Sequence, residues 1–153
     1  MTYLLDTNII VFMVRGLKIH ANPSERQRER EQEAHRIFDR AQKRKLSGHQ
    51  IALSAITVAE LEFGARNSRD YEEESDVTRR AIAPFALLPF DANDCATHYG
   101  KIRHALESAG KAIGSLDTLI AAHALALEAT LVTNDAAEFS RVPGLTCEDW
   151  TAR

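Results

Sequence analysis

The sequence has few of the residues that form disulfide frameworks or zinc sites. Only two of its 153 residues are cysteines, Cys95 and Cys147, and their spacing matches neither a paired-thiol motif nor a zinc motif. The six histidines form no ligand pattern either. We therefore expect a fold without disulfides, with free thiols in a reducing compartment.

Long apolar runs, repeats and linkers are also missing. No positively charged start leads into a long apolar stretch, so we expect neither a signal peptide nor a membrane span, and a cytoplasmic protein. Without internal repeats or low-complexity linkers, the chain is expected to form a single domain over residues 1–153.

Charge of one sign does not dominate, because the formal net charge is −3, which argues against a general nucleic-acid coat. The basic helical segment, residues 24–47, is an exception: residues 26–45 carry eight basic against four acidic side chains, a local charge of +4. Within it, Arg36, Arg40 and Arg44 share one helix face. This stripe is either a solvated face or a ridge that contacts RNA phosphates or a partner.

Short apolar runs alternate along the chain with segments of helical spacing. We expect strands near 3–5, 51–54, 87–90, 130–133 and 146–150, and helices near 8–14, 24–47, 55–65, 71–83, 91–110 and 115–127. This alternation predicts an α/β fold, in which helices cover both faces of a central, mostly parallel sheet.

The sequence gives a separate structural prediction for each of two glycines. Gly16 is placed where a glycine commonly follows the last residue of a helix. Gly64 lies inside a predicted helix, where glycine costs roughly 1 kcal/mol relative to alanine. The simplest reason for Gly64 is close approach of another backbone.

Four acids lie at related positions of the predicted fold. Asp6 and Asp135 directly follow strands, while Glu60 and Asp117 lie in the first turns of helices. Each alone has an ordinary explanation, such as a helix cap, a solvated position, a favourable dipole interaction or a turn. In a parallel sheet, however, all four positions point to one edge, where ligands bind.

Four carboxylates at one edge would need a counter-charge. At a separation of 4 Å each pair repels by roughly 4 kcal/mol at an effective dielectric constant of 20. With no histidine or cysteine among them, an all-oxygen site favours Mg²⁺ or Mn²⁺ over Zn²⁺. Such a cation can activate a water molecule for attack on a phosphodiester, so these residues predict metal-dependent phosphodiester hydrolysis.

Four motifs, in order, resemble those of PIN-domain ribonucleases, and most of all the VapC toxins of bacterial type II toxin-antitoxin systems. They are LDTNI at 5–9, SAITVAEL at 54–61, IGSLDTLIAAHA at 113–124 and LVTND at 131–135. The resemblance covers nearly the whole chain. The stretch between Arg15 and Gln50 departs from it, because it is longer and more basic than the family pattern.

The resemblance implies a PIN-like fold and a Mg²⁺- or Mn²⁺-dependent endoribonuclease that cuts RNA. A cognate VapB-type antitoxin would neutralise it, in a homodimer or a toxin-antitoxin hetero-oligomer. Of the acids, Asp6, Asp117 and Asp135 would hold the metal directly or through water, and Glu60 would position or deprotonate the attacking water. Four polar residues would support them by hydrogen bonds: Thr7, Asn8, Ser115 and Thr133.

Two other classes of protein fit part of the pattern. A haloacid-dehalogenase-type phosphatase also has an aspartate after its first strand, but its chemistry needs a second aspartate where this chain has Asn8. A catalytically degenerate PIN-like module would bind RNA or protein without cutting. The presence of all four acids argues against that reading.

Overall fold

The structure is a computed structural model that describes all residues from 1 to 153, and its centre is one sheet of five strands. The strands lie in the order β3-β2-β1-β4-β5, and every neighbouring pair is parallel. Their bounds are β1 Thr2–Leu5, β2 Gln50–Ser54, β3 Ala86–Leu88, β4 Thr130–Val132 and β5 Cys147–Glu148. The predicted α/β class is confirmed, and the sheet is wholly parallel.

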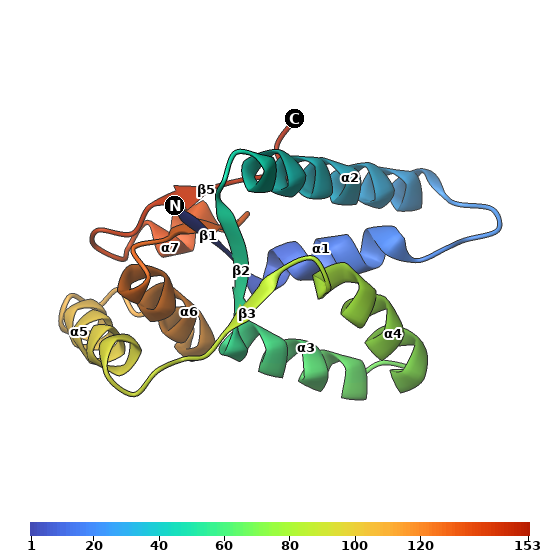
Figure 1. The fold of residues 1–153 in the computed structure, drawn as a ribbon. Coiled ribbons are helices and arrows are strands. Elements are labelled where there is room, and N and C mark those ends of the chain that lie inside the picture. Colours follow the sequence, from blue (N-terminus) through green and yellow to red (C-terminus); the bar gives the residue numbers. More distant parts are fainter.

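Seven helices complete the fold, and they cover both faces of the sheet (Figure 1). Helices α1, α2 and α4 lie on one side of the sheet, whereas α5, α6 and α7 lie on the other. Their bounds are α1 Thr7–Leu17, α2 Glu25–Leu46, α3 Ala55–Arg66, α4 Tyr71–Ile82, α5 Asp94–Ser108, α6 Ser115–Ala126 and α7 Ala136–Phe139. The short helix α7 was not predicted from the sequence.

The central strand β1 divides the core in two, because successive side chains of a strand point to opposite faces. Tyr3 and Leu5 join a cluster of buried residues with α1, α2, α3 and α4. Leu4 joins a second cluster, which contains the buried alanines of α6 and the apolar residues of α5. Both faces of β1 are therefore sealed, and its end is held in a fixed position.

Helix α2 begins where the sequence predicts. The Ser24 side chain accepts a hydrogen bond from the Gln27 amide at 3.2 Å, and the Gln27 side chain accepts one from the Ser24 amide at 2.8 Å. This reciprocal pair is a capping box, which satisfies two amide groups at the helix start. The buried face of α2, with Ile37 and Ala41, packs over α1.

The two glycine expectations are both wrong. Gly16 lies inside α1, not after it, and a Cβ atom there would collide with Ala34 of α2 and lie 2.7 Å from the Arg30 carbonyl oxygen. Gly64 is exposed, and a Cβ there would meet nothing within 4 Å. The close approach of two backbones occurs between α1 and α2, and Gly16 permits it.

None of the helices combines the length and the apolar character needed to cross a membrane.

The two glycines form a matched pair for mutation. Gly16→Ala should lower the free energy of unfolding by about 1 to 3 kcal/mol, because the new methyl group meets the backbone of α2. Gly64→Ala should raise it by up to about 1 kcal/mol, because a helix interior favours alanine and the space is free. Urea unfolding of both variants measures these changes. Equal effects at the two sites would contradict the close approach of α1 and α2.

Candidate active site at the carboxyl edge of the sheet

The order of the strands creates a crevice beside β1. From β1 the chain proceeds to β2 and β3 on one side, and β4 and β5 lie on the other side. The switch in direction falls between β1 and β4, and ligands of open parallel sheets bind at the carboxyl edge of such a switch point. Asp6 follows β1 and Thr133 follows β4, so both lie at this point.

Asp6 is buried, with 2% of its surface exposed, and both of its carboxylate oxygens accept hydrogen bonds. The Thr7 amide donates to Oδ1 at 2.8 Å and the Thr133 hydroxyl donates to Oδ2 at 2.9 Å. Burial nevertheless raises the pKa of Asp6 to about 6, and the negative charges of Glu60 and Asp135 add to this rise. Asp6 is thus the N-cap of α1, and ionisation of its carboxyl group in the crevice is unfavourable.

Glu60 reaches the crevice from α3, the helix after β2. The Thr7 hydroxyl donates a hydrogen bond to Glu60 Oε1 at 2.9 Å and lies 3.1 Å from the hydroxyl oxygen of the buried Thr57. Thr57 precedes Glu60 by one helical turn, so both face the same way. The first residue of α1 therefore fixes the position of Glu60.

Asp117 lies in the first turn of α6, close to the backbone of Gly114. A Cβ atom at Gly114 would lie 3.2 Å from Asp117 Oδ2, so glycine leaves room for the carboxylate. Burial raises the pKa of Asp117 to about 6, and four acids raise it further by repulsion, in decreasing order Asp6, Glu138, Glu60 and Asp135. These pKa effects show that five acids share one electrostatic environment.

The fifth acid, Glu138, was missed from the sequence. It lies in α7, where its amide donates to Asp135 Oδ1 at 3.3 Å. Its carboxylate accepts a hydrogen bond from the Gly114 amide at 3.1 Å, which ties α7 to the loop before Asp117. The Thr133 hydroxyl in turn accepts from the Asp135 amide at 3.0 Å. The sequence feature that could have indicated Glu138 is its position three residues after Asp135, a spacing of about one helical turn.

The four supporting residues expected from the resemblance are placed differently. Thr7 and Thr133 make the hydrogen bonds to Glu60 and Asp6 described above. Asn8 and Ser115 are exposed, and neither side chain makes a hydrogen bond with an acid. Thr57 is a further polar contact of the site that the sequence reasoning did not name.

The donor set fits a hard cation only in part. All the donors are carboxylate or hydroxyl oxygens, which suit Mg²⁺ or Mn²⁺, and burial, with added repulsion between the acids, raises the pKa values of Asp6 and Asp117. However, no three acidic, histidine or cysteine side chains are arranged so that they could hold one metal ion together. Asp6, Asp117 and Asp135 are therefore not placed so that all three could bind one metal ion directly.

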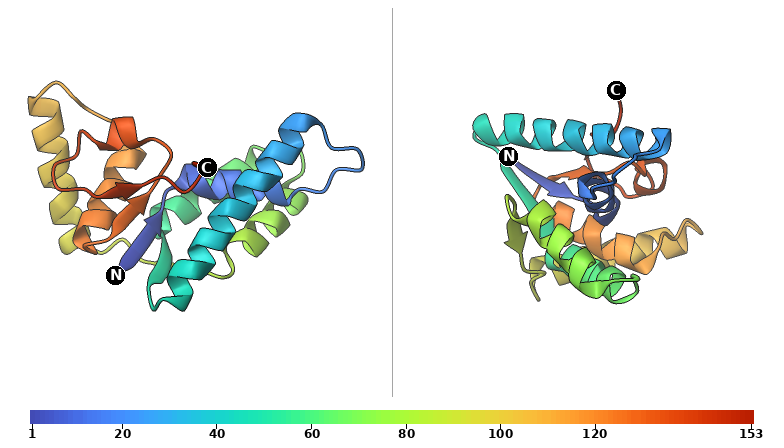
Figure 2. Two further views of the ribbon diagram at one scale, coloured as in Figure 1. Left: turned by 90° about the horizontal axis from the view of Figure 1, so that it is seen from above. Right: turned by 90° about the vertical axis from the view of Figure 1, so that its right-hand side faces the viewer.

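The arginine stripe of α2 lies against the chain's own C-terminal residues, which run beside α2 (Figure 2). Arg36 donates to the Thr151 carbonyl at 3.3 Å, and Arg40 donates to two further carbonyls of this segment at 3.1 and 2.8 Å. Arg44 lies 3.3 Å from Glu148 and over the ring of Tyr3. The sequence predicted either a solvated face or a ridge that contacts RNA or a partner, and not this contact with the chain's own C-terminal segment. Contact with RNA or a partner stays a prediction.

Comparison with known proteins agrees with the fold and the motifs. Residues 3–145 match the PIN domain family. The chain is 35% identical over 150 residues to Ribonuclease VapC2 of Rickettsia felis, covering 98% of each protein. It is 34% identical over 149 residues to the tRNA(fMet)-specific endonuclease VapC of Shigella flexneri, covering 97% of this chain and 98% of that protein.

Solved structures give the same result. The crystal structure of VapBC2 from Rickettsia felis bound to a promoter DNA fragment contains a chain that superposes with a TM-score of 0.81 at 31% identity, covering 98% of this chain and 99% of that one. A chain of FitAcB from Neisseria gonorrhoeae superposes with a TM-score of 0.70 at 27% identity, covering 97% of each. The chain belongs to the PIN domain family, and the relatives named above place it with the VapC ribonucleases, as its motifs predict.

The raised pKa of Asp6 makes stability depend on pH. An aspartate whose pKa is raised on folding favours the folded state below the unfolded-state pKa near 4, and this contribution is lost as the pH rises through about 6. In EDTA, Asp6→Asn should therefore increase the free energy of unfolding by about 2 to 3 kcal/mol at pH 7.5, and by about half as much at pH 5.

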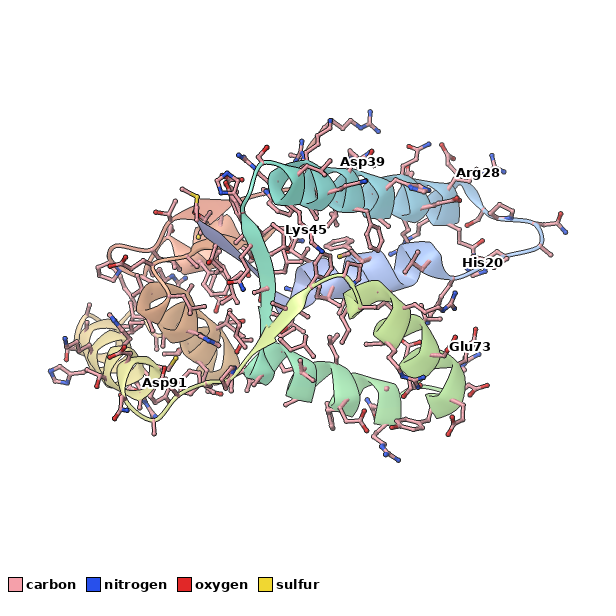
Figure 3. The ribbon with its side chains drawn as sticks, viewed as in Figure 1. His20, Arg28, Asp39, Lys45, Glu73 and Asp91 are labelled. Carbon is pink, nitrogen blue, oxygen red and sulfur yellow. The ribbon has the colours of Figure 1, made fainter.

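Urea unfolding at the two pH values measures this difference. Asp39→Asn is the matched control, since Asp39 is an exposed acid of α2 (Figure 3) and should show no comparable difference. If Asp6→Asn destabilised the protein equally at both pH values, folding would not raise the pKa of Asp6.

The arginine contacts give a separate prediction. Arg40→Ala should lower the free energy of unfolding by about 1 kcal/mol and speed amide exchange in residues 149–152, because two hydrogen bonds to their carbonyls are lost. Arg26→Ala is the control, on an exposed arginine of the same helix. Hydrogen exchange measured by mass spectrometry follows both. Unchanged exchange together with weaker RNA binding would favour the ridge interpretation instead.

Proposed function

We propose that this protein is a Mg²⁺- or Mn²⁺-dependent endoribonuclease and the toxin of a toxin-antitoxin pair. The single observation that carries the proposal is the gathering of five acids at the switch point of the sheet, two of them with a pKa raised to about 6. Strongly raised pKa values in a crevice favour a functional site over a set of surface acids. The VapC ribonucleases among its relatives support the reaction class.

The protein's own side chains have distinct roles in this proposal. Asp6, immobilised by Thr7 and Thr133, would be the central cation ligand. Asp117 and Asp135 would help to hold the cation, and the charge of Glu138 acts on Asp117. Because no three carboxylates converge, they would hold the cation largely through its water molecules, as is common for Mg²⁺. A bound Mg²⁺ or Mn²⁺ lowers the pKa of a water molecule and stabilises the leaving oxygen of the RNA phosphodiester.

Glu60 is the proposed general base. The Thr7 hydroxyl donates to its Oε1 and leaves Oε2 without a hydrogen bond from the protein. This second oxygen can accept the proton of the attacking water, and Thr7 restricts the rotation of the carboxylate. Hydrolysis then adds the water oxygen to phosphorus and breaks one phosphodiester bond of the RNA.

A protein antitoxin is the proposed partner, because this chain superposes on chains of the DNA-bound VapBC structures from Rickettsia felis and Salmonella typhimurium. A groove of about 330 Å³ between α1, α3 and α4 begins at Thr7 and Glu60 and continues past Val11, Val14 and Arg15. A peptide segment in this groove would lie next to the acids. We therefore propose a VapB-type antitoxin, with this chain in a homodimer or a toxin-antitoxin hetero-oligomer. We propose the cytoplasm as its location, where RNA and such a partner are present.

The proposal predicts that the purified protein cleaves RNA with Mg²⁺ or Mn²⁺ and loses this activity in EDTA. Asp6→Asn and Glu60→Gln should each lower the rate by at least about 100-fold, since one loses the central ligand and the other the base. Gel analysis of a structured RNA, followed by mapping of the new ends, measures the cleavage.

Thermal unfolding gives a second readout that needs no activity. Mg²⁺ should raise the Tm of the wild-type protein more than that of Asp6→Asn, because a ligand that binds only the folded state stabilises it. Asp39→Asn should behave as wild type in both assays. Cleavage that survives EDTA or Asp6→Asn would overturn the proposed mechanism, and a protein that binds RNA without cutting it would favour the degenerate PIN-like module.

A further inference from the structure

His123 is buried on α6, with 1% of its surface exposed, although the reaction proposed above makes no use of it. Its Nδ1 lies 2.8 Å from the hydroxyl oxygen of Ser54, a residue that is itself completely buried. Phe90 meets the imidazole edge-on, with 5.7 Å between the ring centroids. The ring is therefore held on one side by a hydrogen bond and on another by an aromatic contact.

The hydrogen bond has a direction that the surroundings define. The Ser54 hydroxyl oxygen already accepts from the Ile56 amide at 3.0 Å, as the cap of α3. Its proton needs an acceptor, since a buried hydroxyl without a partner is costly, and His123 Nδ1 lies within reach. Burial lowers the pKa of His123, against an opposing effect of Asp91. We therefore assign a neutral imidazole that accepts at Nδ1.

This bond joins two helices that carry acids of the site. Ser54 ends β2 and caps α3, on which Glu60 lies six residues further along the chain. His123 lies on α6, six residues after Asp117. Thr7 ties Glu60 to α1, but among the side-chain hydrogen bonds only the one from Ser54 to His123 ties the start of α3 to α6.

We propose that His123 is a positioning residue of the ribonuclease site: through its hydrogen bond with Ser54 it sets α3, and with it Glu60, in register with α6 and Asp117. This inference rests on the proposed function and adds to it a residue that touches neither RNA nor a cation. Its effect is on the geometry of the acids, because small displacements of a catalytic group lower the rate strongly.

The test compares two replacements of the same ring. His123→Asn keeps an oxygen acceptor near the place of Nδ1, whereas His123→Leu fills similar space without an acceptor. With a defined RNA oligonucleotide and saturating Mg²⁺, His123→Leu should lower kcat about tenfold or more and change KM less than about twofold. His123→Asn should recover most of the lost kcat. Urea unfolding of both variants separates this effect from a loss of stability.

Ser54→Ala provides the same test with the imidazole left in place, and applies also if His123→Leu does not fold. It should lower kcat as His123→Leu does, whereas Asp70→Ala, which removes the corresponding cap of α4, should not. Wild-type kcat in His123→Leu and Ser54→Ala, or no recovery in His123→Asn, would overturn the inference. Absence of cleavage by the wild-type protein would instead overturn the proposed function.

Discussion

The carboxylate of Asp6 is held out of water at the end of the central strand, among four other acids. Burial and the neighbouring charges oppose its ionisation, while the Thr7 amide and the Thr133 hydroxyl favour it, and the balance still leaves its pKa near 6. The fold could relieve this repulsion by moving the acids apart, but β1 is sealed on both faces by the two core clusters. The core therefore stabilises a site that is electrostatically unfavourable by itself.

The elements around Asp6 are connected through polar contacts rather than through the acids themselves. Thr7 connects α1 with α3, Glu138 connects α7 with the loop before α6, and Ser54 connects α3 with α6. Each contact involves a helix start, where amide groups and caps are available for hydrogen bonds. The site is thus built at helix starts that the parallel sheet collects at its carboxyl edge. This explains why acids that are far apart in sequence share one environment.

The sequence predicted those parts of the fold that depend on local pattern. The strand before Asp6, the start of α2 after Ser24 and the first turn of α6 with Asp117 all follow from short-range signals. The four acids could also be predicted as a group, because the end of a parallel strand has a defined place in the fold. Besides burial, Glu60 and Asp135 raise the pKa of Asp6, and Asp6, Glu60 and Asp135 raise that of Asp117, which agrees with this expectation.

The remaining features depend on contacts between distant segments. Helix α7 is too short to show a helical period, so the sequence did not single out Glu138. Gly16 and Gly64 both lie within helices, and only Gly16 lies against α2. Likewise, the arginine stripe of α2 gave no sign that residues 148–152 of the same chain would lie against it. These are properties of packing, which local sequence does not encode.

The central proposal is that a divalent cation would relieve the repulsion among these acids. NMR titration of the side-chain carboxyl carbons of Asp6 and Asp117, with and without Mg²⁺, tests it most directly. Without Mg²⁺ both groups should titrate near pH 6, and with Mg²⁺ their titration should move well below that value. Ordinary aspartate titration in the absence of Mg²⁺, or titration that Mg²⁺ leaves unchanged, would contradict the account.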